Sequence, residues 1–446
     1  MRIIIAGAGE VGTHLAKMLS NENHEIILID TDEERLKPVS STMDVLTYIG
    51  SATSINILEE LLHKKTDLFI AVTHWEDTNI TASILAKKLG ALKTIARIDN
   101  LDYLEHSTVE FFQSLGIDSL IYPELIAARE VLSLLHETGT TDFMEFCGGK
   151  LAMYVQKLDQ NAPIIDKSLV ELAASTNTEK YRAVAIKRND ITIIPRGNEV
   201  FRQGDLVFVI STIDGIDEMM ITSGKENFEA KSIMILGGSR IGKHVALYMQ
   251  KNCQVKLIDS DPLRCEALSD VLENTLIING DCRNADLLQH EGIAHMDAFV
   301  AVTGNSETNV LSCLLAKKLG VKKTIAEVEN MEYINLAENI GIDTIINKKI
   351  AAASRIFRHT TNPNVTQVKY MTGTEAEVIE FKVPENARIT RGTLRSLDFP
   401  ANSIVGGGTR YGVPFIATGD TIINPNDNIV VFTLPSAYER VSKFFN

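Results

Sequence analysis

The sequence has few cysteines and no long apolar run, and each shortage excludes a class of protein. Its five cysteines form no C-x-x-C pair, which argues against structural disulfides and against a thiolate zinc site. No apolar stretch approaches the ~18 residues that a membrane span requires. Polar residues also interrupt the apolar N-terminus too early for a signal peptide. We therefore expect a cytoplasmic chain.

Patterns typical of catalysis are missing as well. The ten histidines form no H-E-x-x-H motif, and no serine stands in a G-x-S-x-G elbow. The net charge of −14 argues against nucleic acid as a partner. It still allows docking onto a basic surface, such as the Lys/Arg-rich cytoplasmic loops of a membrane protein. We predict no catalytic residue, no bound metal and no nucleic-acid partner.

What the sequence does contain begins at its N-terminus, where an isoleucine-rich strand runs into a Gly-x-Gly-x-x-Gly turn. Gly7 allows the tight turn, Gly9 lets the backbone approach a pyrophosphate, and Gly12 lets a helix pack on the strand. A second apolar strand ends at Asp30, 18 residues after Gly12. An acid at that spacing can bind an adenosine ribose and repels the 2′-phosphate of NADP.

We therefore predict a nucleotide-binding Rossmann domain at residues 1–135. Five apolar segments, near residues 2–6, 25–30, 45–50, 68–73 and 94–98, read as strands buried on both faces of a parallel sheet. The predicted contact residues are Gly7, Ala8, Gly9, Glu10, Val11, Gly12, Asp30, Thr31, Ser51, Ala52, Thr53, Thr73, His74 and Arg97.

Residues 140–222 change in style to short β-rich runs, with hairpin turns near 189–190 and 203–205, and predict a small α+β domain. The sequence then repeats at an offset of 230 residues, as from Ile3 to Ile233, with a second Rossmann domain at 230–357 and a second small domain at 365–446. The predicted fold class is α/β, with two tandem Rossmann-like parallel-sheet domains, each followed by a small α+β domain. Linkers are expected near 138–141, 222–225 and 359–364.

The duplication predicts a second nucleotide site that differs from the first. Aspartate is kept, but Gly9 becomes Ser239, Glu10 becomes Arg240, His74 becomes Gly304, and Arg97 becomes Glu327. We expect unequal affinities, with the first site closer to a standard dinucleotide site. A P-loop-like run from Gly237 to Lys243 lacks the final Ser or Thr that holds magnesium. The predicted contact residues are Gly237, Gly238, Ser239, Arg240, Ile241, Gly242, Asp259, Ser260, Asp281, Cys282, Thr303, Gly304 and Glu327.

This layout resembles the TrkA family, the peripheral subunits of bacterial Trk potassium-uptake systems that are built from RCK (KTN) domains. The resemblance covers essentially the whole chain. It rests on the turn from Gly7 to Gly12 with Asp30, on the strand tips at 71–73 and 94–97, and on their counterparts in the second repeat. The family has an acid after the third strand, which Asp281 keeps and Ser51 does not.

The resemblance implies a regulatory role. Nucleotide binding, by NAD(H) or alternatively by ATP or ADP, would bias the opening of a membrane potassium-translocating subunit. It also implies a homo-oligomeric RCK ring, either a tetramer of this two-repeat chain or dimers of it, peripheral on the inner face of the cell membrane. The apolar segments 117–135 and 342–357 are candidates for the oligomer interface, unless they pack on their own sheets.

Two other classes of function stay open. An NAD-dependent oxidoreductase would require an acid–base residue beside the cofactor, and none is recognisable. A scaffold built on degenerate nucleotide folds would bind no nucleotide.

Overall fold

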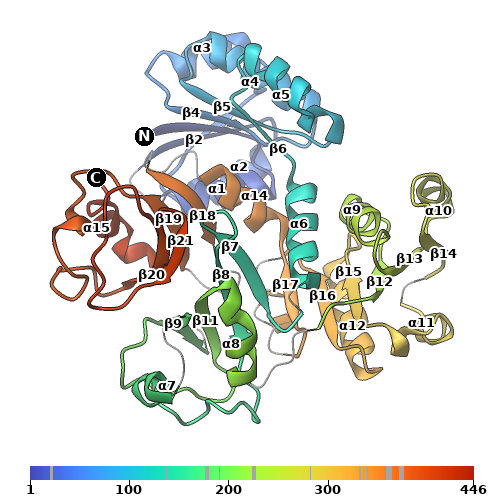
Figure 1. The fold of residues 1–446 in the computed structure, drawn as a ribbon. Coiled ribbons are helices and arrows are strands. Elements are labelled where there is room, and N and C mark those ends of the chain that lie inside the picture. The colour runs from blue at the N-terminus through green and yellow to red at the C-terminus, as the bar shows by residue number, and fades with distance from the viewer. Residues whose placement is uncertain are drawn as a thin grey trace. The chain divides into compact units, whose positions relative to one another are not determined.

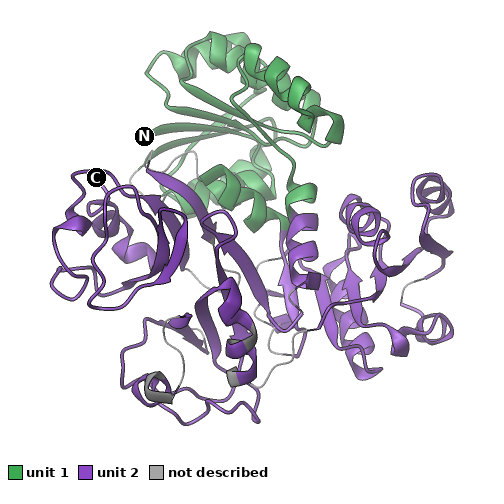
Figure 2. Cartoon of the chain, viewed as in Figure 1, with its two compact units in different colours: residues 1–126, 348–361 green, residues 127–347, 362–446 purple. Residues whose placement is uncertain are grey.

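The computed structural model describes residues 1–446 except 21–23, 137, 176–179, 190, 224–227, 282, 331–332, 335, 338–339, 358–363 and 371–375. Figure 1 shows two parallel sheets flanked by helices and two smaller antiparallel sheets. The predicted fold class is confirmed. The chain divides into two compact units, coloured in Figure 2: Met1–Ile126 with Lys348–Thr361, and Ala127–Asn347 with Asn362–Asn446.

The first sheet has six parallel strands in the order β3-β2-β1-β4-β5-β6. These are β1 (Arg2–Ala6), β2 (Glu25–Asp30), β3 (Leu46–Ile49), β4 (Leu68–Ala71), β5 (Lys93–Arg97) and β6 (Ser119–Ile121). The connecting helices are α1 (Glu10–Ser20), α2 (Glu33–Thr42), α3 (Ile55–Leu62), α4 (Glu76–Lys88), η1 (Leu101–Leu104) and α5 (His106–Ser114). The strand order reverses between β1 and β4, and the carboxyl ends of these strands form the edge where such sheets bind ligands.

Two expectations about this sheet need correction. The strand β3 is not buried on both faces, because it lies at the sheet edge, and its Leu46 and Ile49 are exposed. The sixth strand, β6, was not predicted, since three residues are too few to show a period. The end of α4 behaves as expected: Gly90 follows it with φ +113°, the left-handed geometry of a glycine C-terminus.

The first small domain is a five-stranded antiparallel sheet in the order β10-β9-β11-β8-β7. Its elements are β7 (Asp142–Phe146), β8 (Leu151–Lys157), α7 (Leu169–Ser175), β9 (Tyr181–Arg188), β10 (Ile191–Ile193), β11 (Leu206–Thr212), η2 (Ile213–Gly215) and α8 (Ile216–Ser223). The predicted hairpin turn is marked by Asn189 at φ +55°, while its Asp190 lies outside the described residues.

The second Rossmann sheet repeats the first, in the order β14-β13-β12-β15-β16-β17. Its strands are β12 (Ser232–Leu236), β13 (Gln254–Asp259), β14 (Thr275–Asn279), β15 (Ala298–Ala301), β16 (Lys323–Glu327) and β17 (Thr344–Ile346). Its helices are α9 (Arg240–Met249), α10 (Pro262–Ser269), α11 (Ala285–His290), η3 (Ile293–His295) and α12 (Ser306–Lys318).

The second small sheet has the order β18-β19-β22-β20-β21. Its elements are β18 (Val365–Tyr370), β19 (Glu377–Lys382), η4 (Arg388–Arg391), β20 (Ser403–Arg410), β21 (Val413–Ile416), β22 (Asn428–Thr433), η5 (Pro435–Ala437) and α15 (Tyr438–Ser442). One face of it packs on the first small sheet, where the rings of Phe208 and Phe432 lie 5.6 Å apart. The predicted linker at 359–364 lies outside the described residues apart from Asn364.

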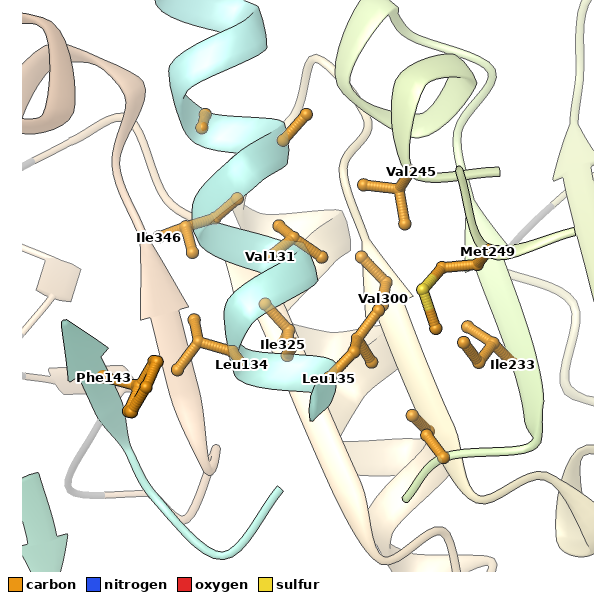
Figure 3. Close-up of a cluster of buried hydrophobic side chains, with 14 of the residues drawn as sticks. Val131, Leu134, Leu135, Phe143, Ile233, Val245, Met249, Val300, Ile325 and Ile346 are labelled. Carbon is orange, nitrogen blue, oxygen red and sulfur yellow. The ribbon is translucent and has the colours of Figure 1, made fainter. Parts of the chain in front are cut away.

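The helix that ends each Rossmann repeat lies in the compact unit of the other repeat. Helix α6 (Pro123–His136) follows the first sheet, but Val131, Leu134 and Leu135 pack in one core with residues of α9 and of the second sheet (Figure 3). Helix α14 (Lys348–Phe357) follows the second sheet but packs on α1 of the first unit. The apolar surface of both segments is therefore covered within this chain, neither by their own sheets alone nor by an oligomer interface.

The packing of α14 on α1 predicts a pH dependence. His14, on α1, has its pKa lowered from 6.5 to about 4 by burial, and further by the charges of Lys17 and Lys349. The unfolded chain therefore binds the proton first, so stability is complete above pH 6.5 and falls as the pH drops towards 4. The loss should reach about 3 kcal/mol in urea denaturation curves. A His14→Gln variant should lose this slope, and an unchanged slope would assign it to other groups.

Candidate functional site

The first glycine turn joins β1 to α1, and its three glycines have different surroundings. Gly7 has φ +109°, and a Cβ atom there would lie 2.9 Å from the amide nitrogen of Thr73. A Cβ atom on Gly12 would lie 1.8 Å from the carbonyl oxygen of Gly7. On Gly9 it would meet no protein atom within 4 Å. The fold thus requires Gly7 and Gly12, whereas the space beside Gly9 is open.

Asp30 ends β2 beside this turn, and two backbone amides hold its carboxylate. Ala8 N donates to Asp30 Oδ2 at 2.6 Å, and Asp32 N donates to Asp30 Oδ1 at 2.9 Å. Carboxylate oxygens accept more than one hydrogen bond, so ribose hydroxyls can still be bound. Gly9 has no side chain to cap α1, which leaves the first amides of the helix for an anion. These residues fit an adenine nucleotide.

A buried asparagine that the sequence reasoning missed holds the strand ends around this opening. Asn79 Oδ1 accepts from Thr73 N at 2.8 Å and from Thr73 Oγ1 at 2.7 Å, and Asn79 Nδ2 donates to Arg97 O at 3.0 Å. Asn309 makes the same bonds to Thr303 and to Glu327 O in the second sheet. The signal was available, because the two asparagines stand 230 residues apart, at the repeat offset.

The other predicted contacts of the first site differ in how accessible they are. Arg97 is partly shielded, and its Nη2 lies 3.4 Å from Glu124 Oε1. His74 is exposed and its ring meets the edge of Trp75, the only tryptophan of the chain. Ser51 and Thr53 bond to each other through their hydroxyls at 2.9 Å. Thr31 and Glu10 are exposed, while the side chains of Ala8, Val11 and Ala52 belong to the core.

The second glycine turn has the same backbone but is more fully bonded within the protein. Gly237 has φ +104°, and a Cβ atom on Gly242 would lie 2.1 Å from Gly237 O. Ser239 caps helix α9, since its Oγ accepts from Gly242 N at 3.3 Å. The serine therefore uses one helix amide that Gly9 leaves for a ligand in the first turn.

The acid of the second site is paired with a cation that the sequence reasoning also missed. Asp259 accepts from Gly238 N at 2.6 Å and from Asp261 N at 2.8 Å, as Asp30 does from its own turn. In addition, Arg264 Nη1 lies 3.1 Å from Asp259 Oδ2. The equivalent Arg35 pairs with Asp32 instead, 3.3 Å away. The two ribose acids are thus unequal in charge balance.

The remaining predicted residues of the second site divide in the same way. Arg283 binds Asp281 through two nitrogens, and this pairing lowers the pKa of Asp281 to about 2. Glu327 is 3% exposed, and Gly304 has open space where a side chain would stand. Ser260 and Arg240 are exposed, Gly238 and Ile241 are buried, and Cys282 lies outside the described residues.

Within the part of the chain that the structure describes, no group of three or more His, Cys, Asp or Glu residues is arranged to hold a metal ion. In the same residues, no helix combines the length and apolar character needed to cross a membrane.

Family models match both halves of the chain. The TrkA-N domain model matches residues 3–123 and again 233–348, and the TrkA-C domain model matches residues 156–220 and 378–446. The chain belongs to the TrkA family. The predicted membership is confirmed, and the two matches of each model reproduce the internal duplication.

Relatives named as TrkA align along the whole chain. "Trk system potassium uptake protein TrkA homolog 1" of Methanosarcina mazei is 32% identical, with 100% of each chain covered. The TrkA homolog of Archaeoglobus fulgidus is 33% identical with the same coverage. TrkA of Halomonas elongata is 28% identical over 97% of this chain and 96% of its own.

Solved structures share the fold of this TrkA-family chain. The crystal structure of the GsuK RCK domain superposes with a TM-score of 0.62 at 15% identity, covering 100% of this chain and 94% of that one. The GsuK channel bound to NAD gives 0.61 at 15% identity, covering 100% and 78%. The structure of GsuK bound to ADP gives 0.51 at 14% identity, covering 80% and 68%.

Proposed function

We propose that this chain is a nucleotide-sensing regulatory subunit that gates a membrane potassium-uptake protein and is not an enzyme. The observation that carries the proposal is the duplicated pair of glycine turn and backbone-held acid at the switch point of each parallel sheet. The ligand is NAD(H), with ATP or ADP as alternatives, because all three carry the adenosine ribose that Asp30 and Asp259 are placed to bind.

The partner is a Trk-type membrane subunit at the inner face of the cell membrane. The names of the relatives support it, since they are potassium-uptake proteins of the Trk system. The net charge of −14 suits docking onto basic cytoplasmic loops. We also propose a homo-oligomeric ring, as the RCK-type fold suggests.

Gating follows from differential binding. A nucleotide shifts the equilibrium between two arrangements of the subunit only by its preference for one of them. Two sites with different internal bonding can therefore give two preferences. The first site leaves more of its groups to the ligand, because its acid has no arginine partner and its helix no serine cap.

An Asp30→Ala variant is expected to lose roughly 1–3 kcal/mol of NADH binding at the first site, since a charge-assisted hydrogen bond is removed. The equivalent Asp259→Ala change should cost less, because Arg264 already neutralises that acid. Isothermal titration of both variants and of the wild type measures the difference. An unchanged affinity in Asp30→Ala would show that this acid does not bind the ribose.

The function itself is tested by potassium flux through a co-reconstituted membrane subunit, with each adenine nucleotide added in turn. Flux should change with at least one nucleotide and should lose that response when Asp30 and Asp259 are both replaced. Flux that is indifferent to every nucleotide, together with NAD-linked oxidation of a substrate, would overturn the proposal in favour of an oxidoreductase.

A further inference from the structure

A lysine from the second repeat lies at the glycine turn of the first repeat. Lys349 is the second residue of α14, which packs on α1 within the first unit. Its side chain is only 7% exposed, and its Nζ forms an ion pair with Glu10 Oε2. Glu10 is the first residue of α1 and belongs to the Gly-x-Gly-x-x-Gly run itself.

The charge at this turn explains why a buried lysine is needed there. The amides at the N-terminus of α1 attract a phosphate, but the carboxylate of Glu10 beside them repels it. Lys349 balances that carboxylate, and its ammonium group on a flexible four-carbon chain can bind a phosphate as well. His14, further along α1, is not a competing cation, because its pKa is lowered to about 4.

The second repeat carries the opposite charges at both equivalent positions. Glu10 corresponds to Arg240, and Lys349 corresponds to Glu124, which like Lys349 is the second residue of the helix after the sixth strand. Within the first unit, Glu124 is the partner of Arg97. The second turn thus has a cation of its own, whereas the first turn receives one from α14.

We propose that Lys349 is a phosphate-binding residue of the first nucleotide site, so that this site is built from both repeats. A bound diphosphate then holds α14 on the first Rossmann sheet. This inference rests on the proposed nucleotide function and adds that occupancy of the first site controls the attachment of the exchanged helix.

The test compares ADP with adenosine, which lacks phosphate, in the full chain with the second site disabled by Asp259→Ala. Trp75 lies next to His74 at the first site only, so its fluorescence reports binding there. Lys349→Gln should weaken ADP binding about tenfold, equivalent to 1.4 kcal/mol, and leave adenosine unaffected. Lys349→Arg should restore ADP binding, and Glu10→Gln should strengthen it. Lys88→Gln, an exposed lysine at the end of α4, is the charge-matched control.

Hydrogen exchange provides a second readout. ADP should slow exchange of the peptide covering 348–357 in the wild type and not in Lys349→Gln. An equal loss of ADP and adenosine binding would mean that the lysine is only structural, and unchanged ADP binding would also overturn the inference. A wild-type chain that binds neither ligand would instead refute the nucleotide function. If Lys349→Gln does not fold, Glu10→Gln still decides, because unaltered ADP affinity in that variant contradicts the charge argument.

Discussion

A Gly12→Ala variant is expected to unfold the first Rossmann unit more easily and to lose nucleotide binding there, whereas Gly9→Ala should lose only the binding. The methyl group on Gly12 would enter the carbonyl oxygen of Gly7, a backbone atom that cannot move without displacing α1 from β1. We expect a cost of about 3 kcal/mol or more, the upper range for overpacking. The methyl group on Gly9 would meet no protein atom, so stability should stay within about 0.5 kcal/mol of the wild type.

The two variants together separate the fold from the ligand. Thermal unfolding by circular dichroism measures the first effect, and titration with ADP measures the second. The added methyl of Gly9→Ala occupies the space through which a pyrophosphate would approach, so affinity should fall at least about tenfold. Normal ADP binding by Gly9→Ala would place the phosphates elsewhere, and a stable Gly12→Ala protein would contradict the packing role of that glycine.

The second large effect is expected at Lys369, on β18. Its Nζ lies 2.7 Å from Glu130 Oε1 of α6 and 2.9 Å from Asp142 Oδ1 of β7, and all three side chains are less than 18% exposed. Burial opposes the charge, but Asp142 and Glu130 outweigh it and raise the pKa of Lys369. Lys369→Ala would leave two buried carboxylates without their cation and should cost about 3–5 kcal/mol. It joins a helix of the first repeat to both small sheets.

Denaturation curves with hydrogen exchange of α6 and β18 would locate this loss. Since the pKa of Lys369 is raised, its contribution should be complete below the ordinary value of 10.5 and should fall only as the pH rises beyond it. Lys37→Ala on α2 is the control, because that lysine pairs with Glu34 on the exposed surface. Equal behaviour of the two variants would show that the buried cluster adds no stability.

The fold was largely predictable from the sequence because strand cores and turn glycines are local patterns. The segment predicted at 25–30 coincides with β2, and Gly7 and Gly12 occupy positions that no other residue fits. The duplication supplied the second half. The three-residue strand β6 escaped, since so short a segment shows no periodicity, and the exposure of β3 depends on which strand lies at the edge.

The site was less predictable, because pairing partners depend on rotamers and on packing between distant segments. Arg35 and Arg264 occupy equivalent positions, yet only Arg264 turns towards its ribose acid. Lys349 stands 339 positions after Glu10 (349 minus 10), and no spacing rule connects a helix to a sheet that is not its own. Which residues contact the nucleotide remains a prediction of this work.

The exchanged helices carry a consequence for the ancestry of the chain. A single-repeat ancestor could cover its last helix in the same way only on a second copy of itself, so it would have been an obligate homodimer. In a symmetric dimer the contacts at the two glycine turns are identical by necessity. Fusion of the two genes removed that constraint, and each half could then acquire its own charges. Glu10 with Lys349, against Arg240 and Glu124 at the equivalent positions, is a divergence that only a fused pair can inherit.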